Sequence, residues 1–108
     1  MENLSRSEEI VLLAIWNLQD EAYGVKILEK LRATTGTNWT IGAIYAPLHR
    51  LAEKGYIEAR TEPPQPWRGG RSRIFYRLTR WGKEVLAEAR CIHEALWKNA
   101  PDLELEKT

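Results

Sequence analysis

Residues 60–83 read RTEPPQPWRGGRSRIFYRLTRWGK. This stretch holds seven of the chain's 16 Lys and Arg residues and a single acid, Glu62, so its formal net charge is +6. The other 84 residues carry nine basic and 14 acidic side chains, a net of −5. The total of +1 therefore conceals a basic segment on an acidic body, an asymmetry that attracts a polyanion such as a nucleic-acid backbone.

The same stretch predicts a β-hairpin. Residues 56–62 and 72–78 read as strands, and in the second run Ile, Tyr and Leu alternate with Phe and Arg at the strand period of two. Between the runs, the prolines of residues 63–66 stiffen the connection and Gly69-Gly70 supplies the turn. A two-stranded hairpin is not stable alone, so we expect it to dock on neighbouring elements.

Two helices are expected at the start of the chain. Ser5 and Glu8 form an S-x-x-E capping box, and the first helix then begins at about Arg6. Residues 10–16 are apolar on every face of this helix, so it needs cover on more than one side. The second helix is expected over residues 22–35. Its expected cap is Asp20 or Glu21, its stop is Gly36, and its apolar positions are Val25, Ile27, Leu28 and Leu31.

A third helix is expected from the cap Thr40 to Lys54, with Gly55 as its stop. Pro47 lies inside it, removes one backbone hydrogen bond and is expected to bend it. The expected buried face is Ile41, Ile44, Leu48 and Leu51, with Tyr45 at its border and its ring in the core. The expected outward face is Gly42, Ala43, Ala46, His49, Arg50 and Glu53.

Thr79 caps a last helix over residues 80–100, which Pro101 ends. The resulting fold class is mostly α with a small β-hairpin: a winged helix-turn-helix followed by a C-terminal dimerisation helix. Residues 5–79 form the expected DNA-binding domain, residues 80–100 the dimerisation helix, and residues 101–108 a tail expected to be disordered.

In a helix-turn-helix, the second helix of the pair enters the major groove. Arg50 is the predicted bidentate partner of guanine, and the basic hairpin tip is expected to follow the backbone or enter a minor groove. The alternatives are an ordinary surface face and a solvated charge run. The predicted DNA-binding residues are Thr40, Gly42, Ala43, Tyr45, His49, Arg50, Arg68, Gly69, Gly70, Arg71 and Arg73.

The first and last helices both carry apolar surface that needs a partner. We therefore expect two copies to pack around a two-fold axis, which places two recognition helices about 34 Å apart on a pseudo-palindromic duplex. The alternative is a last helix that folds back over its own core. The predicted dimer interface is Leu12, Ile15, Trp16, Val85, Ala89, Ile92 and Leu96.

Several motifs resemble the PadR-like transcriptional regulators. Residues 23–27, YGVKI, resemble the family's YG-x-x-I; residues 42–57 are similar to its G-T-L-Y … L-x-R-L-E-x-x-G-L-I; and residues 70–82 resemble its wing strand and Y-x-L-T-x-x-G junction. The single last helix matches the short subfamily. Departures are Ala46 and Pro47, where the family's proline directly follows the tyrosine, and Ala52, where a glutamate is expected.

The resemblance implies a bacterial homodimeric repressor that leaves DNA on binding an effector. In some short members a tryptophan of the last helix stacks flat drugs in the dimer interface, and His93 occupies that place here. Trp16, Ile92, His93 and Trp97 are therefore predicted to line a pocket for an aromatic small molecule. The alternative is a plain hydrophobic dimer seam.

Other function classes find little support in the sequence. No nucleophile–base–acid set is visible, and Cys91 and His93 face nearly opposite ways on a helix, so neither an enzyme nor a metal site is expected, and no cofactor. The lone cysteine, the absence of a long apolar run and the absence of a basic N-terminal region predict a soluble cytoplasmic protein, nucleoid-associated when bound to DNA. The rival class is a winged helix used for protein–protein contact.

Overall fold

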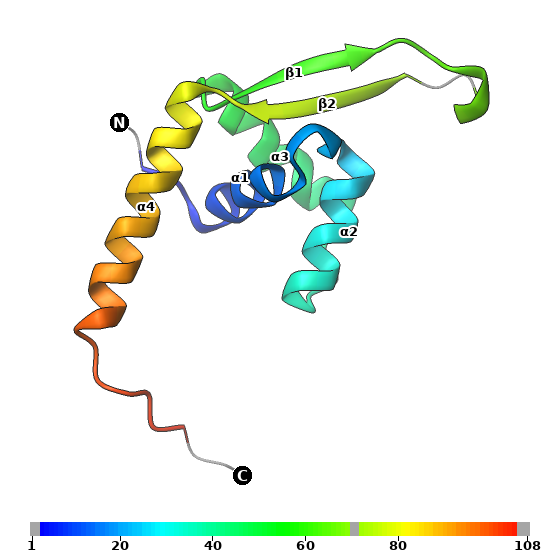
Figure 1. Ribbon diagram of the computed structural model, residues 1–108. Helices are drawn as coiled ribbons and strands as arrows, with labels where there is room; N and C mark the ends of the chain where they lie inside the picture. The colour runs from blue at the N-terminus through cyan, green and yellow to red at the C-terminus, as the bar shows by residue number, and fades with distance from the viewer. Residues whose placement is uncertain (1–2, 70–71, 106–108) are drawn as a thin grey trace.

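The computed structural model describes residues 3–69 and 72–105. The elements follow in the order α1 (Arg6–Leu18), η1 (Gln19–Glu21), α2 (Gly24–Thr35), α3 (Ile41–Glu53), β1 (Ile57–Glu62), η2 (Pro66–Arg68), β2 (Arg73–Leu78) and α4 (Arg80–Lys98). Three helices form the body, the hairpin extends along one side of it, and α4 projects from the base of the hairpin away from the body (Figure 1). This arrangement is the expected winged helix-turn-helix with one added helix.

Three of the helix starts are confirmed in detail. Ser5 and Glu8 form both hydrogen bonds of the capping box. Thr40 caps α3, and the Thr79 hydroxyl accepts from the Gly82 amide to cap α4. The predicted cap of α2 is wrong: Asp20 and Glu21 belong to a 3-10 turn, and α2 begins after Tyr23 without a side-chain cap.

One apolar core fills the space between the helices and the base of the hairpin. Its largest fully buried side chains are Leu12, Ile15, Ile27, Ile44, Leu51 and Val11. One predicted buried position is wrong, because Ile41 is 42% exposed, and Val25, an apolar position of the second helix, is 52% exposed. Both residues lie in the first turn of their helix, beyond the edge of the face that packs on the core. Pro47 is buried inside a helix that continues through it.

The hairpin is antiparallel, with Ile57 opposite Leu78 and Glu62 opposite Arg73. It docks on the body through backbone contacts: the Tyr76 amide donates to the Ala22 carbonyl at 2.8 Å. An isolated bridge joins Tyr23 to Phe75, and their rings pack with centroids 5.2 Å apart. The wing is therefore held along its inner half.

Only the first part of α4 packs on the body. Val85 is buried and Leu86 is partly buried against the core, whereas every residue of the range 91–100 is exposed. The alternative in which the last helix folds back over its own core is therefore wrong for the outer half of α4.

Candidate nucleic-acid interface

The face of α3 that points away from the core carries small and polar side chains. The Thr40 hydroxyl accepts a hydrogen bond from the Ala43 amide at 3.1 Å, which fixes the start of the helix. Gly42 has nothing beyond its own helix within 4 Å of the place where a Cβ would stand. Ala46 and His49 are exposed further along the same face. The first turns of α3 therefore leave room for another molecule to approach the backbone closely.

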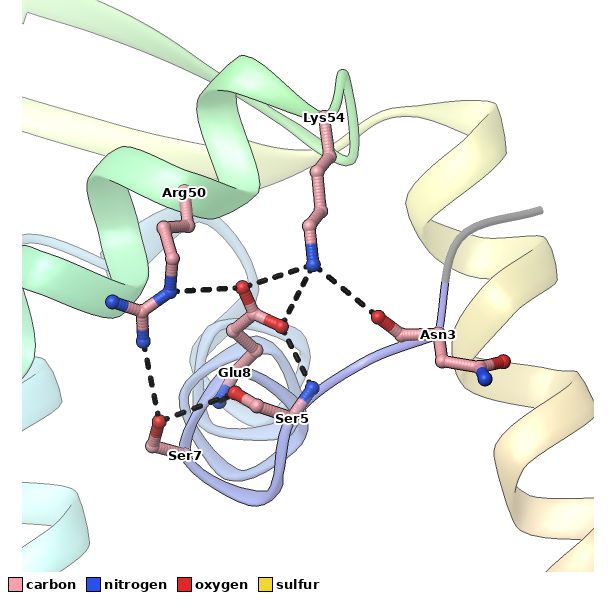
Figure 2. A network of polar contacts seen from close by, with 6 residues as sticks. All are labelled: Asn3, Ser5, Ser7, Glu8, Arg50 and Lys54. Atoms are coloured by element: carbon pink, nitrogen blue, oxygen red, sulfur yellow. Dashed lines mark hydrogen bonds and ion pairs between the residues drawn. The ribbon is translucent and has the colours of Figure 1, made fainter.

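The two polar residues of the last turns differ in their contacts. His49 Nε2 lies 2.8 Å from a carboxylate oxygen of Glu53 and stays at the surface. Arg50 instead turns towards α1, where its Nε donates to Glu8 at 3.0 Å and an Nη reaches the Ser7 hydroxyl at 3.4 Å (Figure 2). The Arg50 side chain is 46% exposed, and its predicted bidentate contact with guanine would require these contacts with α1 to break.

Tyr45 was expected to place its ring in the core, and this prediction is wrong. Its side chain is 51% exposed, because the buried face of α3 is formed by Ile44, Pro47, Leu48 and Leu51. The Tyr45 hydroxyl instead reaches the start of α2, where it would lie 3.4 Å from a Cβ on Gly24.

An open concavity of 390 Å³ joins the start of α2, the middle of α3 and the strand β2. The Arg73 guanidinium carbon lies 4.4 Å from the centroid of the Tyr23 ring, so a cation is held on one wall. Burial raises the pKa of Tyr76, and the neighbouring Tyr45 adds to this shift, so the Tyr76 hydroxyl keeps its proton and remains a donor. The concavity is lined by Tyr23, Gly24, Val25, Tyr45, Ser72, Arg73, Ile74 and Tyr76.

Two further arginines of the wing contact other side chains of the hairpin. The Arg60 guanidinium carbon lies 5.3 Å from the centroid of the Phe75 ring, and Arg77 pairs with Glu58 across the hairpin. Arg68 ends η2, and Gly69 follows with a φ of 69°. The predicted contact residues Gly70 and Arg71 lie outside the described residues.

A second concavity lies between α1 and α4. Its volume is 520 Å³ and its walls are mostly apolar, with Leu13 and Trp16 on the α1 side. His93 Nε2 lies 3.1 Å from a Glu9 carboxylate oxygen, and the Lys83 ammonium lies 5.5 Å from the centroid of the Trp16 ring. We call this surface the α1–α4 groove; it is lined by Glu9, Leu13, Trp16, Leu78, Lys83, Leu86, Ala87, Ala89, Arg90, His93 and Glu94.

The structure divides the predicted dimer and ligand residues. Leu12, Ile15 and Val85 lie in the core of the single chain, so they have no surface to offer a second copy, and this part of the predicted interface is wrong. Trp16, Ala89 and His93 line the α1–α4 groove. Of the others, Ile92 and Leu96 are exposed on α4, and Trp97 lines a separate hollow of 350 Å³ beside Pro101.

Leu13 was missed by the sequence analysis. The signal was present, since Glu9, Leu13 and Trp16 follow at the i, i+4, i+7 spacing of one helix face. The apolar run of residues 10–16 concealed it, because a helix that is apolar all round does not show which face is covered from within.

The described residues lack two features of other classes of function, a metal-ligand cluster and a helix that could span a membrane. No three His, Cys, Asp or Glu side chains in that part of the chain gather as ligands of a metal ion. None of the helices described there combines the length and the apolar character that a bilayer span requires.

Comparison with known proteins gives a consistent result. The model of the transcriptional regulator PadR-like family matches residues 12–88. None of the curated proteins matches the chain.

Solved structures share the fold. A PadR family transcription regulator from Clostridium difficile R20291 is 26% identical with a TM-score of 0.72, over 84% of this chain and 91% of that one. A Streptococcus transcriptional regulator is 27% identical with a TM-score of 0.67, over 84% of each chain. A PadR-like transcription factor from Bacteroides fragilis shares the fold at 23% identity and a TM-score of 0.70, over 86% of this chain and 87% of that one.

Proposed function

Because the chain belongs to the PadR-like family of transcriptional regulators, we propose that it is a homodimeric repressor that binds a pseudo-palindromic DNA operator. Regulation of transcription through DNA is the function of the family. The dimer, the repression and the release by an aromatic effector are our proposals for this chain. Its site of action is the bacterial cytoplasm, at the nucleoid.

The concavity between α2, α3 and β2 is the observation that carries the DNA-binding proposal. It brings Tyr45 of the helix-turn-helix and Arg73 of the wing to one surface, although the two residues belong to different elements. An arginine fixed on a ring, with tyrosine hydroxyls beside it, suits a phosphate oxygen, and phosphate contacts set the position of a protein on a duplex. The net charge of +6 in residues 60–83 supplies the long-range attraction.

The other proposed contacts follow from the exposed face of α3. Thr40, Gly42 and Ala43 form a first turn that fits against the sugar–phosphate wall of the major groove, and His49 stands where it can meet a base edge. The wing tip (residues 68–71) follows the backbone or enters the adjacent minor groove. We assign Arg50 instead to the contact between α3 and Glu8 of α1.

The dimer proposal rests on apolar surface at the outer half of α4. Leu96 is 68% exposed, and Ile92 is exposed on the same stripe. When a second copy of the chain covers such apolar surface, its burial stabilises the dimer. Pairing through α4 and Trp16 would leave both α3 helices free for two half-sites about 34 Å apart.

The proposed effector binds in the α1–α4 groove. Trp16 offers a ring face there, and His93 with Glu9 offers polar contacts at the rim. A flat aromatic molecule suits this combination of walls. An effector at this place would bind beside the dimer surface. Its binding would alter DNA affinity through the pairing of the two copies.

An electrophoretic shift assay at two salt concentrations tests the function. We expect the wild type to shift a duplex that it selects from a random-sequence library, and the affinity to fall steeply with salt. Arg73→Glu should abolish the shift while circular dichroism stays unchanged. Lys98→Glu, which changes the charge equally at the far end of α4, should retain binding. A wild type that shifts no duplex even at low salt would favour the protein–protein module.

A further inference from the structure

Glu8 is the one charged side chain that is fully buried in the described part of the chain, at 1% exposure. It stands in the first turn of α1, yet two of its partners lie far along the chain: Arg50 in the last turn of α3, and Lys54, which caps the end of that helix. The Lys54 ammonium donates to both carboxylate oxygens, at 2.9 and 3.1 Å, and Arg50 Nε donates to one of them at 3.0 Å. The Ser5 amide donates to the other oxygen at 2.7 Å (Figure 2).

The contacts extend from Glu8 to the chain on either side of it. Lys54 also donates to the Asn3 carbonyl at 3.2 Å, and Arg50 also reaches the Ser7 hydroxyl at 3.4 Å. Figure 2 shows both cations converging on the carboxylate from the end of α3, Arg50 from its last turn and Lys54 from its C-cap. The end of α3 is therefore attached to the start of α1 at several points around one buried acid.

These polar contacts differ in kind from the rest of the α3 interface. Ile44, Leu48 and Leu51 attach α3 through apolar burial, whose driving force has no preferred direction. Charge-assisted hydrogen bonds have a preferred direction and a short range. The ion pairs at Glu8 thus add directional contacts between α1 and the end of α3 to the apolar packing of that helix.

We propose that Glu8 is a positioning residue for DNA recognition: through Arg50 and Lys54 it fixes the rotation of α3 and hence the side chains that face the bases. The inference rests on the proposed function, because it assumes that α3 reads the duplex. Glu8 itself does not touch DNA. Its substitution alters sequence discrimination rather than the general attraction between the protein and a polyanion.

Charge alone gives the opposite expectation, and this makes the inference testable. Glu8→Gln removes one negative charge, so electrostatics by itself predicts equal or tighter binding to any duplex. A rotated α3 predicts weaker binding to the selected duplex and unchanged binding to a scrambled one. The loss of one good base contact corresponds to a fall in discrimination of roughly tenfold or more.

The experiment measures affinity for the duplex that the wild type selects from a random library and for a scrambled duplex of equal composition. Glu8→Gln is compared with Glu29→Gln, an equal charge change at an exposed position of α2, under conditions where both are folded by circular dichroism. We expect the ratio of the two affinities to fall at least tenfold for Glu8→Gln and to stay unchanged for Glu29→Gln.

Lys54→Met, with Lys98→Met as its control, keeps the test decisive where Glu8→Gln does not fold, because Arg50 then still pairs with Glu8. Lys54→Met should lower the same ratio. A folded Glu8→Gln or Lys54→Met protein with wild-type discrimination would overturn the inference and leave the proposed function standing. A wild type that enriches no sequence would refute the proposed function and this inference with it.

Discussion

Gly82 is the position where one added methyl group should cost the most. A Cβ at this residue would stand 2.0 Å from the Tyr56 carbonyl oxygen and 3.0 Å from its carbon. The carbonyl cannot easily move aside, since it accepts a hydrogen bond from the Thr79 amide at 3.0 Å. Thr79 is also the cap of α4 and donates its hydroxyl to the Gly55 carbonyl. Gly82→Ala must therefore push α4 away from the chain that joins α3 to β1.

The magnitude follows from three contributions. Overpacking against backbone falls at the upper end of the usual range, about 3 kcal/mol. Loss of the Thr79–Tyr56 hydrogen bond adds about 1 kcal/mol, and the higher helix propensity of alanine returns about 1 kcal/mol. We expect Gly82→Ala to lower the free energy of unfolding by about 3 kcal/mol, which lowers Tm by on the order of 10 °C.

Gly42→Ala is the matched control, because both glycines lie in the first turn of a helix. Gly42 has an ordinary helical φ, and a Cβ there would meet no other atom within 4 Å, so alanine should raise the free energy of unfolding by up to about 1 kcal/mol. Urea unfolding, followed by circular dichroism at one protein concentration, measures both variants. The reasoning is refuted if Gly82→Ala unfolds within about 0.5 kcal/mol of the wild type, or if both variants shift in the same direction.

Three further outcomes are expected. Burial raises the pKa of Glu8, but the Ser5 amide, Lys54 and Arg50 together lower it from 4.5 to about 2. The stability from this shift is present above pH 4.5 and lost as pH falls towards 2, so the difference in unfolding free energy between wild type and Glu8→Gln should shrink by about 2 kcal/mol from pH 7 to pH 3; an unchanged difference in urea curves would contradict it. Gln19 has φ 53° and ψ −123°, and its Nε2 donates to the Trp16 carbonyl, so Gln19→Gly should have a higher Tm than Gln19→Ala: both lose this hydrogen bond, and only glycine relieves about 1 kcal/mol of strain; a Tm no higher than that of Gln19→Ala would count against this. Leu96→Asp should yield monomers in light scattering, and a persistent dimer would remove α4 from the interface.

Features set by neighbouring residues could be predicted from the sequence. The capping box of Ser5 and Glu8 and the cap at Thr79 need only a side chain and an amide three residues away. The strands were predicted to within one residue because their period of two and their turn residues are also local signals. Once these caps and turns are placed, the helices and strands between them can be arranged in only a few ways.

Features set by distant residues could not be predicted. Glu8 was read as half of a capping box, and nothing local indicates that it also binds side chains 42 and 46 residues further along. The same limit explains Leu12 and Ile15, which share an all-apolar helix with the exposed Trp16. The packing of α2, α3, β2 and α4 against α1 decides which of these faces stays open.

The position of α1 links the two candidate sites. Its first turn presents adjacent carboxylates in different directions: Glu8 holds α3 through Lys54 and Arg50, and Glu9 meets His93 on α4 at the rim of the α1–α4 groove. In a dimer that pairs through α4, the distance between two recognition helices depends on the angle between α3 and α4. Since α1 contacts both helices, its packing contributes to that angle, together with the base of the hairpin. The effector that we propose for the groove would touch α1 and α4 together, and so would act on a helix that also contacts α3, without any contact with the DNA-facing side.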